Sequence, residues 1–106
     1  LHGEAVAWGL STELTLSAAR LKKGSPEALK FLALRDELNQ KFPCPVIPPV
    51  PSELWTWALK DKKNADDAVH MVLLSERGTP LVHQAVTWGE FATACSANTP
   101  PSSNPA

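Results

Sequence analysis

A histidine at the amino-terminal end is the residue best suited to bind a metal. His2 directly precedes an apolar helical pattern, and a neutral imidazole at the start of a helix can coordinate Zn²⁺ while the helix fixes its direction. A catalytic zinc usually takes three protein ligands and a water or substrate. The chain has no HxH, HExxH or Asp/His cluster to complete such a set. His2 is therefore a candidate ligand of an incomplete site.

A run of charged residues is the second candidate site. Asp61-Lys62-Lys63-Asn64 follows a predicted helix, so its cations could hold a phosphate or a carboxylate. Judged by spacing alone, a solvated charged turn is the default interpretation of this run.

Other groups of residues give weaker evidence for a catalytic or binding site. His70 and His83 could face one another across a hairpin, but paired strand histidines are more often polar surface residues. The sequence contains no Gly-rich phosphate loop and no GxSxG elbow. The residues alone therefore indicate a helical domain with one candidate metal ligand and one candidate anion site.

Composition limits the class of protein. The chain of 106 residues has a net charge of -1 and no basic run, which argues against general nucleic-acid or membrane-surface binding. No apolar run reaches the roughly 20 residues that span a bilayer, and no signal-peptide pattern is present. Cys44 and Cys95 lie far apart, so we expect two reduced structural thiols in a cytoplasmic protein. The four tryptophans are interpreted as core or interface residues.

The elements that position these residues begin with a helix from Glu4 to about Lys23, where apolar residues recur every three or four positions. One stripe consists of Val6, Leu10, Leu14, Ala18 and Leu21. The other consists of Ala5, Trp8, Thr12, Leu16 and Ala19. Two apolar sides predict a helix packed between neighbours, with Glu13 and Arg20 on a narrower polar edge, and Gly24 suits a left-handed cap after it.

A second helix is predicted over residues 26–42. Ser25 can cap it, and Pro26 fits its first turn because the missing N–H costs nothing there. Its expected buried face consists of Phe31, Leu34, Leu38 and Phe42.

Five prolines predict an extended connector from Pro43 to Pro51. Ser52 is the expected cap of a third helix that stops near Lys60. Its inward face is expected to consist of Leu54, Trp55, Ala58 and Leu59.

The last third of the chain predicts a β-hairpin and a short helix. Residues 69–74 and 81–86 are rich in Val and Leu and flank a Gly/Pro turn. Thr87 and Glu90 have the spacing of a capping box, which predicts a helix through about Cys95. Residues 96–106 are mostly Ser, Asn, Thr and Pro, and we expect a disordered tail. The expected fold is mainly α: one domain over residues 1–95, with about four helices and one hairpin.

Four motifs together resemble a known family. They are Leu1-His2-Gly3-Glu4-Ala5-Val6-Ala7, then Asp61-Lys62-Lys63-Asn64, Val72-Leu73-Leu74 and Gly78-Thr79-Pro80. In this order and at similar separations, they resemble the carboxy-terminal domain of dehydroquinate synthase over about residues 1–95. Because the first motif begins at residue 1, we expect a piece of a larger enzyme.

The resemblance implies a two-domain enzyme of the shikimate pathway, with its active site between an NAD-binding Rossmann-like domain and a mostly helical zinc-binding domain. Such a carbon–oxygen lyase converts 3-deoxy-D-arabino-heptulosonate 7-phosphate to 3-dehydroquinate and phosphate. His2 would be one zinc ligand, and Lys62 or Lys63, with Lys62 favoured, would contact the sugar phosphate. Zinc would act as a Lewis acid while NAD takes and returns a hydride.

The same resemblance implies what must come from elsewhere. The family's other zinc ligands, its catalytic histidine and its NAD-binding glycines lie upstream of the HGE motif. We therefore expect this chain to need an amino-terminal Rossmann-like domain and to be inactive alone. Two alternatives stay open: a related sugar-phosphate cyclase, such as a valiolone or deoxy-inosose synthase, and a non-catalytic remnant that serves as a packing or dimerisation module. A homodimer is compatible with each.

Overall fold

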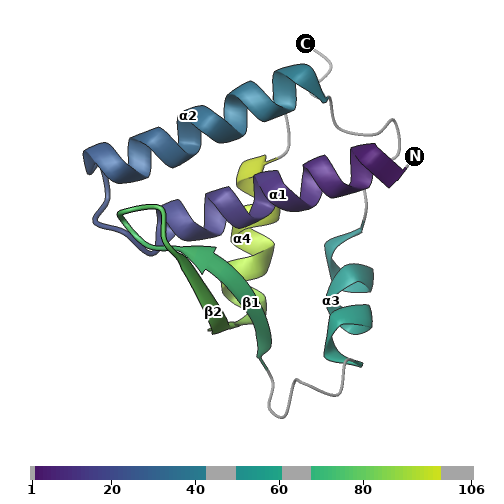
Figure 1. Cartoon of the computed structure of the whole chain (residues 1–106). Helices are drawn as coiled ribbons and strands as arrows, with labels where there is room; N and C mark the ends of the chain where they lie inside the picture. The colour runs from purple at the N-terminus through teal and green to yellow at the C-terminus, as the bar shows by residue number, and fades with distance from the viewer. Residues whose placement is uncertain (1, 43–49, 61–67, 99–106) are drawn as a thin grey trace.

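The computed structural model describes residues 2–42, 50–60 and 68–98. Within these residues the chain folds into four helices and a two-stranded antiparallel sheet, which confirms the expected mainly helical class with one hairpin (Figure 1). The elements in chain order are α1 (His2–Ala19), α2 (Pro26–Lys41), α3 (Pro51–Leu59), β1 (Val69–Leu74), β2 (Pro80–Val86) and α4 (Trp88–Asn98).

Helix α1 is the centre of the arrangement. It packs along α2 on one side and against α4 and β1 on another, as its two apolar sides predict (Figure 1). The main core lies where α1, α3, the hairpin and α4 meet. This core contains Leu16, Trp55, Val69, Leu73, Val86, Phe91, Ala94 and Cys95. A smaller cluster of Ala18, Ala28 and Phe31 joins α1 to α2.

Helix α1 ends four residues before the predicted Lys23. The N–H of Arg20 is shared between the carbonyls of Leu16 and Ser17, both at 3.3 Å, and Leu21 N–H bonds to Ala18 O at 3.1 Å. This tightening to a three-residue spacing closes the helix at Ala19. Gly24 then adopts a positive φ of 78°, in the turn that leads into α2.

Hydroxyl groups form much of the buried surface of α1, which the apolar pattern did not predict. Ser11, Thr12, Thr15 and Ser17 are all buried. Thr15 Oγ1 donates to Ser11 O at 2.9 Å, and Ser17 Oγ accepts from Leu74 N–H at 2.9 Å. These bonds satisfy polar atoms that would be costly to bury alone.

The predicted buried faces of α1 and α2 are wrong in part. Val6 and Leu10 of the first expected stripe are exposed, as are Leu34 and Phe42 of the second helix. Among the four residues expected on the α2 face, Phe31 alone is fully buried. The periodicity locates an apolar side, but burial also needs a neighbouring element to cover it.

The start of α2 agrees with prediction and the start of α3 does not. Ser25 Oγ accepts from Ala28 N–H at 3.2 Å, and Pro26 occupies the first turn. In α3 the first turn holds Pro51, and Val50 is the N-cap without a side-chain bond, so the predicted cap at Ser52 is wrong. Most of the predicted proline connector, residues 43–49, lies outside the described residues.

Helix α3 ends as predicted, with Lys60 at its carboxy-terminal cap. Trp55 is buried, and Leu54 and Ala58 pack against the core, whereas Leu59 of the expected inward face is exposed.

The hairpin and α4 follow the local sequence signals. β1 pairs with β2 in a register that joins Val69 to Val86 and Leu74 to Pro80. Thr87 Oγ1 accepts from Glu90 N–H at 3.3 Å and Glu90 Oε1 accepts from Thr87 N–H at 3.2 Å, which confirms the capping box. Helix α4 continues to Asn98, so residues 96–98 of the expected tail are helical, and residues 99–106 are not described.

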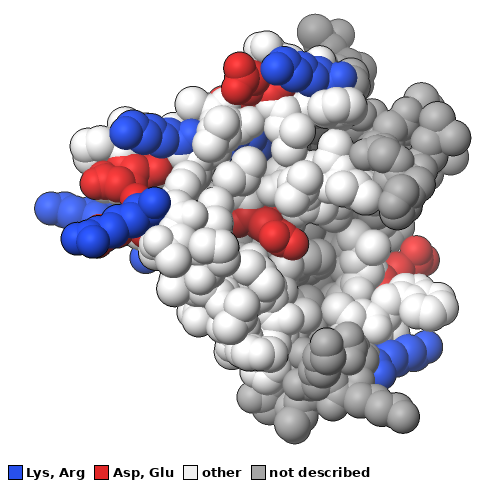
Figure 2. Space-filling view, in the orientation of Figure 1, with Lys and Arg blue, Asp and Glu red and all other residues white. Residues whose placement is uncertain are grey.

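Many charged side chains lie at the end of the molecule where α1 turns into α2, and others lie at the top and right of the view in Figure 2. Figure 2 shows basic and acidic groups side by side where α1 turns into α2, and a largely uncharged face beside them. This mixture of signs agrees with the absence of a basic run. In the described part of the chain, no helix is both long enough and apolar enough to cross a membrane.

Candidate functional site

The structure places His2 at the first residue of α1. Its side chain is not among those the structure describes. Its role as a zinc ligand stays a prediction.

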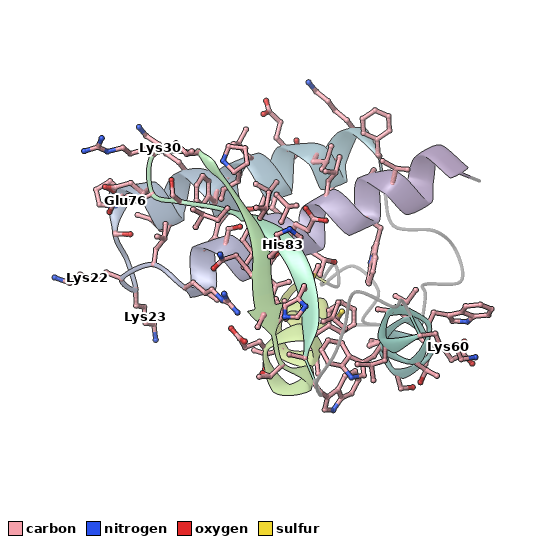
Figure 3. All side chains as sticks on the ribbon, turned by 60° about the horizontal axis from the view of Figure 1, so that its bottom comes forward. Lys22, Lys23, Lys30, Lys60, Glu76 and His83 are labelled. Carbon is pink, nitrogen blue, oxygen red and sulfur yellow. The ribbon has the colours of Figure 1, made fainter. Side chains whose placement is uncertain are left out.

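The lysine pair Lys62 and Lys63 lies outside the described residues. The nearest described residue is Lys60, whose ammonium group lies 4.9 Å from the ring centre of Trp57. Helix α3 begins near the start of α1 and runs away from it, so Lys60 lies far from the beginning of α1 (Figures 1 and 3). The described residues therefore do not test whether Lys62 or Lys63 lies beside His2.

The histidines of the hairpin do not form a pair. His70 is opposite Ala85, and Met71 is opposite Gln84, so His83 is not the cross-strand partner of His70. His83 lies at an irregularity of the register, is exposed (Figure 3), and has a positive φ of 55°. Among the residues described here, no three His, Cys, Asp or Glu side chains come together as metal ligands.

Arg20 and Glu90 form a polar contact that joins three elements of the described fold. Arg20 Nε lies 3.0 Å from Glu90 Oε2 and its Nη2 lies 3.1 Å from Oε1. The same guanidinium donates to the carbonyl of Ala85. The hydrogen bond from Arg20 lowers the pKa of Glu90 below its ordinary value. This contact ties the end of α1 to β2 and α4, and its geometry indicates a structural role.

An aromatic cluster lies between α3 and α4. The ring centres of Trp55 and Phe91 are 5.4 Å apart, and Trp88 lies 5.9 Å from Trp55. Tilted rings at these separations attract one another. Trp57 differs, because it is 72% exposed on the outer side of α3. Trp55 therefore fits the predicted core role, and Trp57 presents an apolar surface to solvent.

Sequence reasoning missed a groove between α1, α2 and the hairpin, with a volume of about 390 Å³. We call it the α1–α2 groove. Its lining residues are Leu10, Glu13, Leu14, Ser17, Leu34, Glu37, Leu38, Lys41, Val72, Leu74 and Pro80. The four-residue spacing of its leucines was visible in the sequence, but we assigned them to the core. Figure 2 shows an acidic side chain in the middle of the uncharged face over α1.

A second groove, between α1, α2 and α4, has a volume of about 700 Å³ and many alanines in its lining. Arg35 and Glu90 are among its charged residues. Arg35 already pairs with Asp36 at 2.8 Å, and Glu90 pairs with Arg20. These two charges are therefore engaged within the chain, and the exposed Lys23 is the third charged residue of the lining.

Comparisons of this chain with protein-family profiles, with curated proteins and with solved structures found no match. The family resemblance therefore depends on the four sequence motifs alone.

Proposed function

We propose that this chain is the carboxy-terminal, zinc-binding part of an enzyme similar to dehydroquinate synthase. The main observation that supports this proposal is the HGEAVA run. It opens the central helix α1, and His2 is the first residue of that helix. Three further motifs follow in the family's order, and the mainly helical class agrees with the mostly helical domain that the resemblance implies. The proposed activity is conversion of 3-deoxy-D-arabino-heptulosonate 7-phosphate to 3-dehydroquinate and phosphate.

In this proposal the chain supplies part of the active site, namely one zinc ligand and one cation that contacts the substrate. The imidazole of His2 fits a Zn²⁺ ligand, and the ammonium group of Lys62 fits the phosphate or carboxylate of the sugar phosphate. An amino-terminal domain supplies the other zinc ligands and binds NAD. When bound, these groups supply Lewis-acid and hydride-transfer chemistry.

Phosphate release tests this function. The chain is assayed alone and joined in frame to the NAD-binding domain of a dehydroquinate synthase, with NAD and Zn²⁺ present. The joined protein should release phosphate and the chain alone should not. Lys62→Met should lower kcat/KM by at least about tenfold through a lost charged contact, and the matched Lys63→Met variant should have a smaller effect. Turnover by the chain alone, or an inactive but folded joined protein, would overturn the proposal.

The substrate separates this proposal from a related sugar-phosphate cyclase. The same joined protein is offered heptulosonate, sedoheptulose and glucose phosphates at equal concentrations. Preference for the heptulosonate supports the dehydroquinate synthase activity. Preference for either of the others assigns the chain to a related cyclase.

Exposed apolar residues favour the alternative of a packing or dimerisation module. Leu10, Leu34 and Val72 line the groove and are about half exposed, and Trp57 on α3 is 72% exposed. Apolar surface that gathers in patches often marks an interface. Sedimentation of the isolated chain tests this, since a module of this kind associates with itself or with added domains, and a clean monomer at all concentrations counts against self-association.

A further inference from the structure

The α1–α2 groove has the shape that receives a helix. Leu10 and Leu14 lie four residues apart on α1, and Leu34 and Leu38 lie four apart on α2. Rows of side chains at this spacing form ridges, and the space between two ridges accepts a third helix. Val72 of β1 closes part of the wall.

The apolar rim of the groove is open. Leu10 is 48% exposed, Leu34 49% and Val72 46%. Val6, four residues before Leu10, extends the α1 row and is also exposed. An apolar occupant would remove the exposed half of these side chains from water, and such burial is favourable.

Two carboxylates line this apolar surface, and they differ in burial because Glu37 of α2 is exposed to solvent whereas Glu13 is not. Glu13 lines the groove and is partly buried, and burial raises the pKa of its side chain. Lys41 also lines the groove, but in the described part of the chain no cation forms an ion pair with Glu13. An occupant that places a cation beside Glu13 compensates a carboxylate that is already partly removed from water.

We propose that the α1–α2 groove docks an amphipathic helix of another polypeptide, one that carries a Lys or Arg within its apolar stripe and pairs that cation with Glu13. The leucine rows favour a helix with an apolar stripe. Glu13 favours a cation at the position of that stripe that lies beside it, and so sets the register of the bound helix. This inference does not depend on the proposed enzymatic activity.

Selection from a displayed helix library tests the proposal. The library consists of helices of about 18 residues with an apolar stripe in which one central stripe position is varied through every amino acid. It is selected on the full chain and on three variants: Glu13→Lys, Glu13→Gln and Glu53→Lys. The last changes an exposed acid on α3 and is the charge-matched control. Circular dichroism checks that each variant is folded.

Helices retained by the unchanged chain and by Glu53→Lys should carry Lys or Arg at the varied position at least about tenfold more often than Asp or Glu. Glu13→Lys should reverse this preference, and Glu13→Gln should abolish it. The proposal is overturned if no helix is retained, or if the preferred residue is the same for all four proteins. It is also overturned if sedimentation shows a dimer that Glu13→Lys dissociates, because a second copy then occupies the groove.

Discussion

The guanidinium of Arg20 meets the carboxylate of Glu90, 70 residues further along the chain, through two bonds of 3.0 and 3.1 Å. Glu90 also accepts from the N–H of Thr87 at the start of α4. One carboxylate therefore caps α4 and holds α4 to the end of α1.

Replacing Glu90 by Gln should lower stability at neutral pH by about 0.5 to 1 kcal/mol, since an exposed ion pair and a charged cap are both weakened. The pKa of Glu90 is lowered in the fold, first by the Arg20 hydrogen bond. Its contribution is therefore present above its ordinary value of 4.5 and lost as the pH falls through the folded value. Urea unfolding of both proteins at neutral and acidic pH should show a difference that disappears in acid. A difference that persists there would contradict the assignment.

Ser17→Ala should cost about 1 to 3 kcal/mol, because it removes the acceptor of the Leu74 N–H from a buried position. Thr15→Val is the matched control. Its hydroxyl donates to a helix carbonyl that has a backbone partner, so the expected loss is below about 1 kcal/mol. Urea unfolding midpoints compare the two, and equal losses would show that the Ser17 bond has no special weight.

Two tryptophans that lie two residues apart should differ strongly in how much stability is lost when each is replaced by Ala. Trp55 is buried in the aromatic cluster, and Trp57 is 72% exposed. Trp55→Ala should cost about 3 to 5 kcal/mol, whereas Trp57→Ala should stay within about 1 kcal/mol, since it loses mainly the exposed contact with Lys60. Thermal unfolding followed by far-ultraviolet circular dichroism measures both. Similar shifts would contradict the placement of Trp55 in the core.

Cys95 should react slowly with thiol reagents while the chain is folded. Burial raises the pKa of its thiol to about 11, so the reactive thiolate is scarce near neutral pH. Because the unfolded chain ionises near the ordinary value of 9.0, stability should fall as the pH rises from about 9 towards 11. Labelling of a Cys44→Ser variant with a disulfide reagent, with and without urea, measures Cys95 by itself. Rapid labelling without urea would show that the thiol is accessible.

The sequence correctly predicted the starts of α2 and α4 and the hairpin turn, which local hydrogen bonds define. Ser25 and the Thr87–Glu90 box specify helix starts within a few residues, and Gly78 takes a positive φ of 76° in the hairpin turn. Such signals need no knowledge of distant neighbours.

The buried faces of the helices were harder to predict, because elements that are distant in the sequence decide which side chains are covered. Leu10 and Leu34 follow a helical period, yet no described element covers them, whereas Ser17 is buried because β1 lies over it. The same limit applies to Glu13, which sequence periodicity placed on a polar edge and the fold placed in a groove. Periodicity reports which side of a helix a residue is on and not what packs there.

For the candidate site, the sequence supplied residue types and the resemblance supplied roles. His2 begins α1, but its partners in a zinc site would come from another domain. Lys62 and Lys63 lie outside the described residues. The family roles of these three residues therefore stay proposals.

Zinc bound to the joined protein tests the central claim most directly. Zinc affinity is measured by competition with a chelator for the unchanged protein, for His2→Ala, and for His83→Ala, which removes an exposed histidine of β2. If His2 is a ligand, His2→Ala should weaken zinc binding by at least about tenfold, and His83→Ala should leave it unchanged. Equal zinc affinity in all three proteins would contradict the assignment of His2 and, with it, the proposed zinc-dependent function of this chain.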